Sequence, residues 1–181
     1  MFYNSLVVDY LTVISSFESN ALQMREQGSQ LEAAIDMVIE SGLMTITDTV
    51  LWVKAEGHTK VRLRVEHPTE REFALELQQN ARLPERFTIQ LLYKRRPARR
   101  YCSLTPHTQA VDCDEAPGQR ILGKHKHRWS DISGDECAYV PDDMTGDLVE
   151  ECFNEFCAEC GITFLGAWND PPIQREIEDL R

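Results

Sequence analysis

Residues 59–79 read TKVRLRVEHPTEREFALELQQ, and apolar side chains alternate with polar ones on both sides of a central His-Pro pair. Alternation with a period of two is typical of a β-strand with one buried and one solvent-exposed face. His67-Pro68 interrupts the pattern, because proline disfavours a continuous strand and suits a turn. The segment therefore predicts two neighbouring antiparallel strands, the basic unit of a β-meander.

The same period extends over the flanking sequence, from about residue 49 to residue 91. Its alternating apolar positions fall into four groups: Val50, Trp52 and Ala55; Val61, Leu63 and Val65; Phe73, Leu75 and Leu77; and Phe87, Ile89 and Leu91. Further strands are expected around residues 100–104, 120–129 and 137–140, with turn-rich loops between them. The centre of the chain is thus predicted to be an antiparallel meander sheet.

Helical periodicity flanks the predicted sheet on both sides. Apolar residues recur every three or four positions in residues 4–27 and again in 29–42, where an S-x-x-E capping box begins the segment and Gly42 suits its end. Residues 144–160 show the same spacing. These segments predict an N-terminal helical hairpin and a C-terminal helix packed on the sheet, which makes the expected fold α+β.

The chain of 181 residues is expected to divide into a helical hairpin at 1–46, the sheet with its C-terminal helix at 47–168, and a tail at 169–181. A hydrophobic content of 42% suits a globular protein. Membrane contact is not expected, because no apolar run approaches the ~20 residues that a spanning helix needs. No signal-peptide pattern is found, so we expect a cytoplasmic protein whose six cysteines are reduced.

A basic segment at residues 94–128 stands out in a chain whose formal net charge is −11. It holds nine of the nineteen Lys and Arg residues and only three acidic residues. A local positive potential of this kind commonly meets phosphate or an acidic protein surface. We expect contacts with RNA or DNA phosphate from Lys94, Arg95, Arg96, Arg99, Arg100, Lys124, Lys126 and Arg128.

Three of the five histidines lie inside this basic segment: His107, His125 and His127. Since residues i and i+2 of a strand share a face, His125 and His127 are expected side by side, with His107 opposite them in a hairpin. RNA cleavage needs a base, an acid and cations that stabilise the charge on phosphorus. These three imidazoles and the nearby arginines can supply all of them, so we predict catalysis by the histidines without a metal ion or another cofactor.

Two other interpretations of the histidines remain open. They could be ordinary polar residues of a sheet, or they could bind zinc together with Cys102, Cys113 or Asp112. The C-x-x-C pair Cys157 and Cys160 also suggests redox chemistry, but it ends a predicted helix, where the helix dipole raises a thiol pKa. For this pair we therefore expect structural burial.

Several short motifs follow one another between residues 71 and 162. In chain order they are Glu72-Phe73-Ala74-Leu75-Glu76-Leu77, Arg86 to Tyr93, Pro106-His107-Thr108, Gly123-Lys124-His125-Lys126-His127, Ala138-Tyr139 and Cys160-Gly161-Ile162. This succession resembles a family of short, uncharacterised bacterial P-H…G-x-H-x-H proteins from mobile and defence loci. It is also similar to TumE-type toxins of toxin–antitoxin pairs. The chain departs from the family pattern at residues 108–112, where the family has a Pro-Asp-Gly turn, and in its N-terminal hairpin.

The resemblance implies a small α+β fold and a role in toxin–antitoxin pairs or antiphage defence. Together with the basic, histidine-bearing sheet, it predicts a protein that engages nucleic-acid phosphate and acts as a metal-independent nuclease, such as a ribonuclease. The expected protein partner is an antitoxin or a larger effector subunit. The alternative is a non-catalytic, acidic interaction subunit that assembles with a larger effector through its N-terminal helices.

Overall fold

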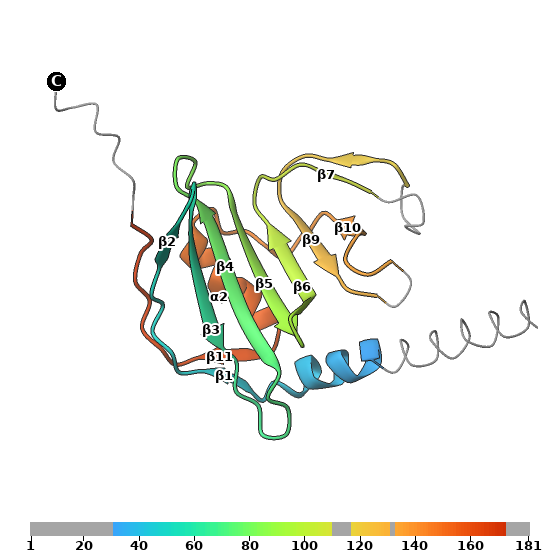
Figure 1. Cartoon of the computed structure of the whole chain (residues 1–181). Coiled ribbons are helices and arrows are strands. Elements are labelled where there is room, and N and C mark those ends of the chain that lie inside the picture. The colour runs from blue at the N-terminus through green and yellow to red at the C-terminus, as the bar shows by residue number, and fades with distance from the viewer. Residues whose placement is uncertain (1–30, 110–116, 131–132, 173–181) are drawn as a thin grey trace, which may run out of the picture.

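The computed structural model describes residues 31–109, 117–130 and 133–172. Within these ranges the chain has an α+β fold with a seven-stranded antiparallel sheet and two helices (Figure 1). Neither of these helices is long and apolar enough to cross a lipid bilayer. The first helix of the expected hairpin, at residues 4–27, and the end of the expected tail lie outside the described residues.

The large sheet has the strand order β10-β9-β6-β5-β4-β3-β2. Its four long central strands, β3 to β6, follow one another along the chain and pair antiparallel, so the predicted meander is confirmed there. The strands are β2 (Val53–Ala55), β3 (His58–Arg64), β4 (Phe73–Asn80), β5 (Phe87–Tyr93), β6 (Arg96–Cys102), β9 (His125–Arg128) and β10 (Ala138–Tyr139).

Both helices lie on the same side of this sheet. Residues 31–41 form the first, which ends at Gly42 with a φ of +65°, a conformation that suits glycine at a helix C-terminus. Helix α2 (Val149–Glu159) lies behind the central strands and buries Phe153 and Phe156 completely in the core (Figure 1). Ile35 and Ile39 of the first helix join the same core, so the apolar stripe of residues 31–41 is used inside the fold.

A small parallel pair of strands ties the two ends of the described chain together. It consists of β1 (Met44–Ile46) and β11 (Ile162–Phe164). Gly161, directly before β11, has a φ of +63°, and a Cβ atom there would lie 2.2 Å from the carbonyl oxygen of Ile39. Only glycine allows this close approach of the two backbones. The sequence pattern did not predict this pair, because three-residue strands show no clear periodicity.

Side-chain alternation gives the large sheet two different faces. The covered face, against the helices, carries one continuous row of paired residues: Val61, Leu77, Ile89, Tyr101 and Lys126. The open face carries two polar rows: Arg62, Glu76, Gln90, Arg100 and His127; and Lys60, Gln78, Thr88, Cys102 and His125. No helix within the described ranges lies over the open face (Figure 1).

The cysteines differ in their bonding. Cys102, Cys152, Cys157 and Cys160 are free and buried, whereas Cys137 is disulfide-bonded. The expectation of six reduced thiols is therefore wrong for Cys137, because sequence spacing does not reveal which thiols the fold brings within bonding distance. Burial raises the pKa of Cys157 to about 12 and also raises that of Cys160, so both thiols are protonated at neutral pH.

Candidate functional site

A pocket of about 570 Å³ lies on the open face of the sheet. Its lining includes the three histidines of the basic segment, His107, His125 and His127, together with Arg100 and Cys102. Further polar groups from β3, β4 and β5 complete it: Lys60, Arg62, Glu76, Gln78, Thr88 and Gln90. The pocket is therefore built mainly from the polar positions of the alternating strands.

One long antiparallel hairpin brings the histidines together. His125 and His127 lie on the same face of β9, and β7 (His107–Thr108) pairs with β8 (Arg120–Ile121) to carry His107 beside them. Their ring centroids are 4.7 to 5.5 Å apart: 5.5 Å for His107 and His125, 4.7 Å for His107 and His127, and 5.1 Å for His125 and His127. The three imidazoles thus form one cluster, as the spacing of the sequence suggested.

Each imidazole is held by a hydrogen bond to a backbone carbonyl oxygen. The pairs are His107 Nε2 with Glu136 at 2.9 Å, His125 Nδ1 with Gly123 at 2.9 Å, and His127 Nδ1 with Asp135 at 2.7 Å. A carbonyl oxygen can only accept, so each ring donates its N–H through the named nitrogen. Nδ1 of His127 also lies 3.3 Å from Nη2 of Arg100, but its contact with the Asp135 carbonyl is much shorter, so we assign the proton to Nδ1 and the Arg100 contact is not a hydrogen bond. In a neutral ring the opposite nitrogen, Nε2 of His125 and of His127, then carries a free lone pair.

The surroundings of the two β9 histidines favour the neutral imidazole. Burial lowers the pKa of His125 below its usual value. For His127, burial and the nearby positive charge of Arg100 lower the pKa to about 3. Arg100 itself forms a 3.0 Å ion pair with Asp135. At neutral pH both rings are therefore bases or ligands and not cationic acids.

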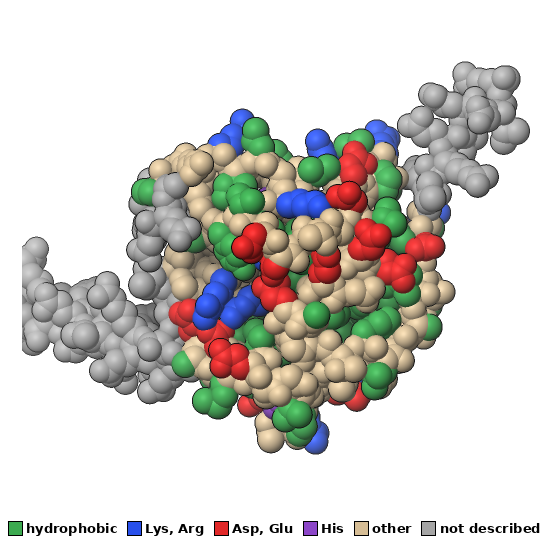
Figure 2. Space-filling model, turned by 180° about the vertical axis from the view of Figure 1, so that it is seen from behind, with side chains coloured by type: hydrophobic (Ala, Val, Ile, Leu, Met, Phe, Trp, Pro, Cys, Tyr) green, Lys and Arg blue, Asp and Glu red, His purple; other side chains and the backbone are tan. Residues whose placement is uncertain are grey.

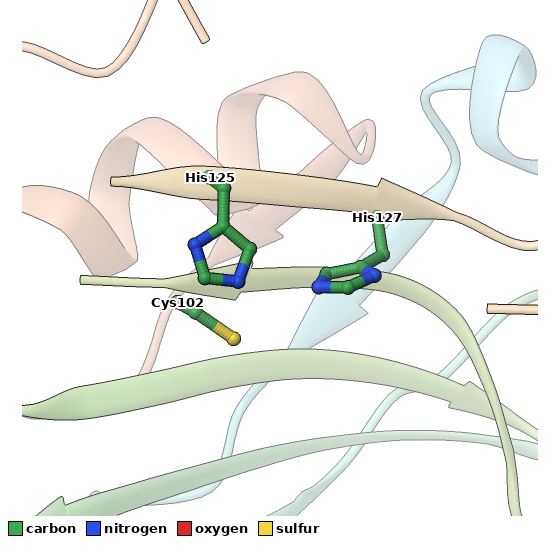
Figure 3. Close-up of side chains that lie close together, drawn as sticks. All are labelled: Cys102, His125 and His127. Atoms are coloured by element: carbon green, nitrogen blue, oxygen red, sulfur yellow. The ribbon is translucent and has the colours of Figure 1, made fainter. Parts of the chain in front are cut away.

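Cys102 adds a thiol to this cluster. It is the direct cross-strand partner of His125 and is only 6% exposed. Its sulfur and one ring nitrogen from each of His125 and His127 all lie within 4.8 Å of one another. Figure 3 shows the two rings turned toward each other, with the sulfur pointing into the space beside them. The sequence had indicated Cys102 only as one of several alternative zinc ligands.

The cations of the covered face are engaged by carboxylates. Arg99 pairs with Asp36 of the first helix, and Arg128 pairs with the same carboxylate. Lys126 is only 2% exposed, and its ammonium lies 2.7 Å from Asp143 and also contacts Glu159 of α2. These three cations hold both helices and the loop before α2 on the sheet. Because they are already paired with carboxylates, they are not available to phosphate.

Three of the other six cations of the basic segment, Lys94, Arg100 and Lys124, also have acidic partners in the described part of the chain. Lys94 pairs with Glu72 at 3.2 Å, and Lys124 pairs with Asp147 at 2.9 Å. Figure 2, which shows the side behind the sheet, has acidic and basic side chains interleaved there. Among the residues expected to bind nucleic acid, Arg95 and Arg96 are exposed and have no carboxylate partner in the described part of the chain.

The cations of the basic segment therefore do not form one continuous positive surface. Successive residues of a strand point to opposite faces, so Arg99 and Arg100 are separated by the sheet itself. Arg96 and Cys102, at the two ends of β6, are about 20 Å apart along the strand, at about 3.3 Å per residue. Sequence reasoning also missed Lys60 and Arg62, which line the pocket. The signal was present, because both occupy polar positions of the alternating stretch TKVRLR.

No protein-family model matches the chain significantly, and the same holds for curated proteins and for solved structures. The resemblance to TumE-type toxins consequently stays a prediction from the order of the motifs. What the site can do has to be inferred from its own geometry.

Proposed function

We propose that the protein is a nuclease, most simply a ribonuclease, whose reactive centre is the histidine cluster on the open face. The observation that carries the proposal is the convergence of His107, His125 and His127 in one pocket that also presents cationic side chains. His107 lies on one arm of the hairpin and His125 and His127 on the other, and all three rings line the same pocket.

The pocket offers the groups that phosphodiester cleavage requires. The free lone pairs on His125 and His127 face the cluster and suit activation of a hydroxyl or water. Lys60 supplies positive charge along the floor, which stabilises the charge that develops on phosphorus. Arg100 and Arg62 also line the pocket, but they are ion-paired with Asp135 and Glu76, so they would have to exchange these partners for phosphate. His107, which is less buried than the β9 pair, is placed for proton transfer at the pocket edge.

A role as a toxin of a toxin–antitoxin pair, or as an antiphage protein with an antitoxin or effector partner, is part of this proposal. Its support is the ordered succession of motifs from residue 71 to residue 162. The rival role, a non-catalytic subunit that assembles through its N-terminal helices, draws less support from the structure. The apolar side of residues 31–41 is already used by Ile35 and Ile39 in the core.

The test is cleavage of end-labelled single-stranded RNA, single-stranded DNA and duplex DNA by the purified full chain. His107→Ala, His125→Ala and His127→Ala are each expected to slow RNA cleavage by about 10²–10⁴-fold, the usual contribution of one proton-transfer group. His67→Ala is the matched control, since His67 lies in a turn outside the pocket.

Induced expression in bacteria supplies an independent readout. The wild-type chain is expected to arrest growth and degrade cellular RNA, and the triple histidine variant is expected to do neither. Cleavage that survives in the triple variant, or no cleavage of any of the three substrates by the wild type, would remove the nuclease proposal and favour the interaction subunit.

A further inference from the structure

The thiol of Cys102 lies close to the imidazoles of His125 and His127, and proton transfer by the histidines alone does not use it. Cys102, His125 and His127 are buried, and their ligand atoms lie within 4.8 Å of one another (Figure 3). We infer that these three side chains bind a divalent transition-metal ion of the Zn²⁺ class. This departs from the sequence-based expectation of a metal-free site.

The sheet itself places the three donors on one side. Cys102 and His125 are paired across β6 and β9, and His127 is two residues further along the same strand. All three side chains therefore project from the open face, from two strands about 4.8 Å apart. Because rigid, hydrogen-bonded strands carry the donors, the site is largely formed before an ion binds.

The outer hydrogen bonds match those of metal-bound histidines. A ligating imidazole almost always donates its other ring N–H to a carbonyl or carboxylate, which orients the ring and selects the tautomer. Here Gly123 and Asp135 accept these bonds from Nδ1, so each Nε2 is left free to face the ion. The hydroxyl of Thr88 lies 3.9 Å from the Cys102 sulfur and supports the third donor.

The donor set also selects the class of ion. Two imidazoles and a thiolate suit Zn²⁺ and similar borderline ions, whereas Mg²⁺ and Ca²⁺ prefer oxygen ligands. In a tetrahedral zinc site the ligand atoms are about 3.3–3.8 Å apart. The distances between the donor atoms of Cys102, His125 and His127 therefore need to shrink by about 1 Å when the ion binds. Binding replaces the thiol proton of Cys102 by the metal, and that proton passes to solvent.

Three protein ligands leave a fourth position for water or substrate, which is typical of catalytic zinc. His107 lies next to the two ligand rings, with its ring centroid 4.7 Å from that of His127 and 5.5 Å from that of His125. A metal-bound water is a strong nucleophile at neutral pH, and the ion polarises a phosphoryl oxygen. When the ion is bound, the lone pairs of His125 and His127 are coordinated, so a metal-bound water takes over the role that these rings have as bases in the metal-free site. This use of the ion rests on the proposed nuclease function, whereas binding of the ion does not.

The experiment titrates the chelator-stripped full chain with Co²⁺ and follows its absorption. We expect one Co²⁺ per chain, a near-ultraviolet thiolate-to-cobalt charge-transfer band, and displacement of Co²⁺ by Zn²⁺. Cys102→Ser should abolish the band, and His127→Gln should weaken Co²⁺ binding by at least about tenfold. Cys157→Ala is the matched control, because Cys157 is a free, buried cysteine in the core of α2.

A wild-type chain without the charge-transfer band, or a band that persists in Cys102→Ser, would overturn the inference. If Cys102→Ser does not fold by circular dichroism, His127→Gln decides, and unchanged Co²⁺ affinity in that variant overturns the inference. Cleavage assays separate the two proposals. A bound ion without any cleavage removes only the nuclease function, whereas cleavage by a chain that shows no band removes only the metal site.

Discussion

The two faces of the seven-stranded sheet use the same basic segment in opposite ways. On the covered face, Arg99, Lys126 and Arg128 are tied to carboxylates of the helices and of the loop before α2. On the open face, one residue away along the same strands, Arg100 and His127 line a pocket. Strand alternation alone therefore divides one cluster of charges into a structural half and a candidate functional half.

This difference shows that clustering in sequence is a poor guide to clustering on a surface when the segment is a strand. In β6 the adjacent cations Arg99 and Arg100 are separated by the thickness of the sheet, and in β9 Lys126 and Arg128 lie on the face opposite His125 and His127. The faces also predict different costs of substitution. Changes on the covered face should reduce stability, and changes on the open face should reduce binding or activity while the fold persists.

The largest effect on stability is expected at Lys126. Its side chain is 2% exposed, and Lys126→Met leaves the carboxylates of Asp143 and Glu159 without their shared cation. Breaking a buried ion pair costs about 3–5 kcal/mol, and because these carboxylates partly reach solvent we expect about 2 kcal/mol. Urea denaturation measures this loss in the free energy of unfolding.

Lys124→Met is the matched control for this change. The Lys124 side chain is 32% exposed and that of its partner Asp147 is 90% exposed, so the pair is weak and the expected loss is below about 1 kcal/mol. Equal losses in the two variants would show that the covered face does not depend on its buried cation. That result would contradict the structural role assigned to the cations of the covered face.

Much of the fold could be predicted from the sequence, because long alternating strands leave a clear pattern. The strands from β3 to β5 and helix α2 followed directly from apolar spacing, whereas β6 was expected around residues 100–104 and lies at Arg96–Cys102. The parallel pairing of β1 with β11 could not be predicted, since it depends on a backbone approach at Gly161 that involves Ile39. Local periodicity carries no information about such distant partners.

The candidate site was only partly predictable, for a similar reason. The i, i+2 spacing placed His125 and His127 on one face, and the expected hairpin placed His107 near them. The ring orientations depend on carbonyl groups of Gly123, Asp135 and Glu136, whose directions follow from loop geometry. The pairing of Cys102 with His125 depends on the strand register between β6 and β9, which is a property of the folded sheet.

A smaller effect on stability is expected in the turn between β5 and β6. Arg95 has a φ of +68°, a left-handed conformation that favours glycine. Arg95→Gly should therefore raise the free energy of unfolding by about 1 kcal/mol, because the side chain no longer opposes the turn. Thermal or urea denaturation of the purified variant measures the change.

Arg96→Gly, one position further along, provides a control of opposite sign. Arg96 begins β6 and pairs with Tyr93, so glycine there should lower stability by about 0.5–1 kcal/mol. Two substitutions of the same chemical type would thus shift stability in opposite directions. If both variants lose stability, the strain assigned to Arg95 is absent.

The smallest effect concerns the pH dependence of the covered side, at Glu155 of α2. Burial alone would raise the pKa of this carboxyl, but hydrogen bonds from Thr145 and from the backbone N–H of Gly146 outweigh it and lower the pKa. A lowered folded-state pKa means that the stabilisation is complete above the unfolded pKa of about 4.3 and is lost as the pH falls through the folded value. Since Glu155 is only half-buried, Glu155→Gln should cost less than about 1 kcal/mol at pH 7. The free energies of unfolding of the wild type and of Glu155→Gln should therefore converge below about pH 4. If the difference between them stays constant from pH 7 to pH 3, the carboxylate charge of Glu155 does not link α2 to the loop that precedes it.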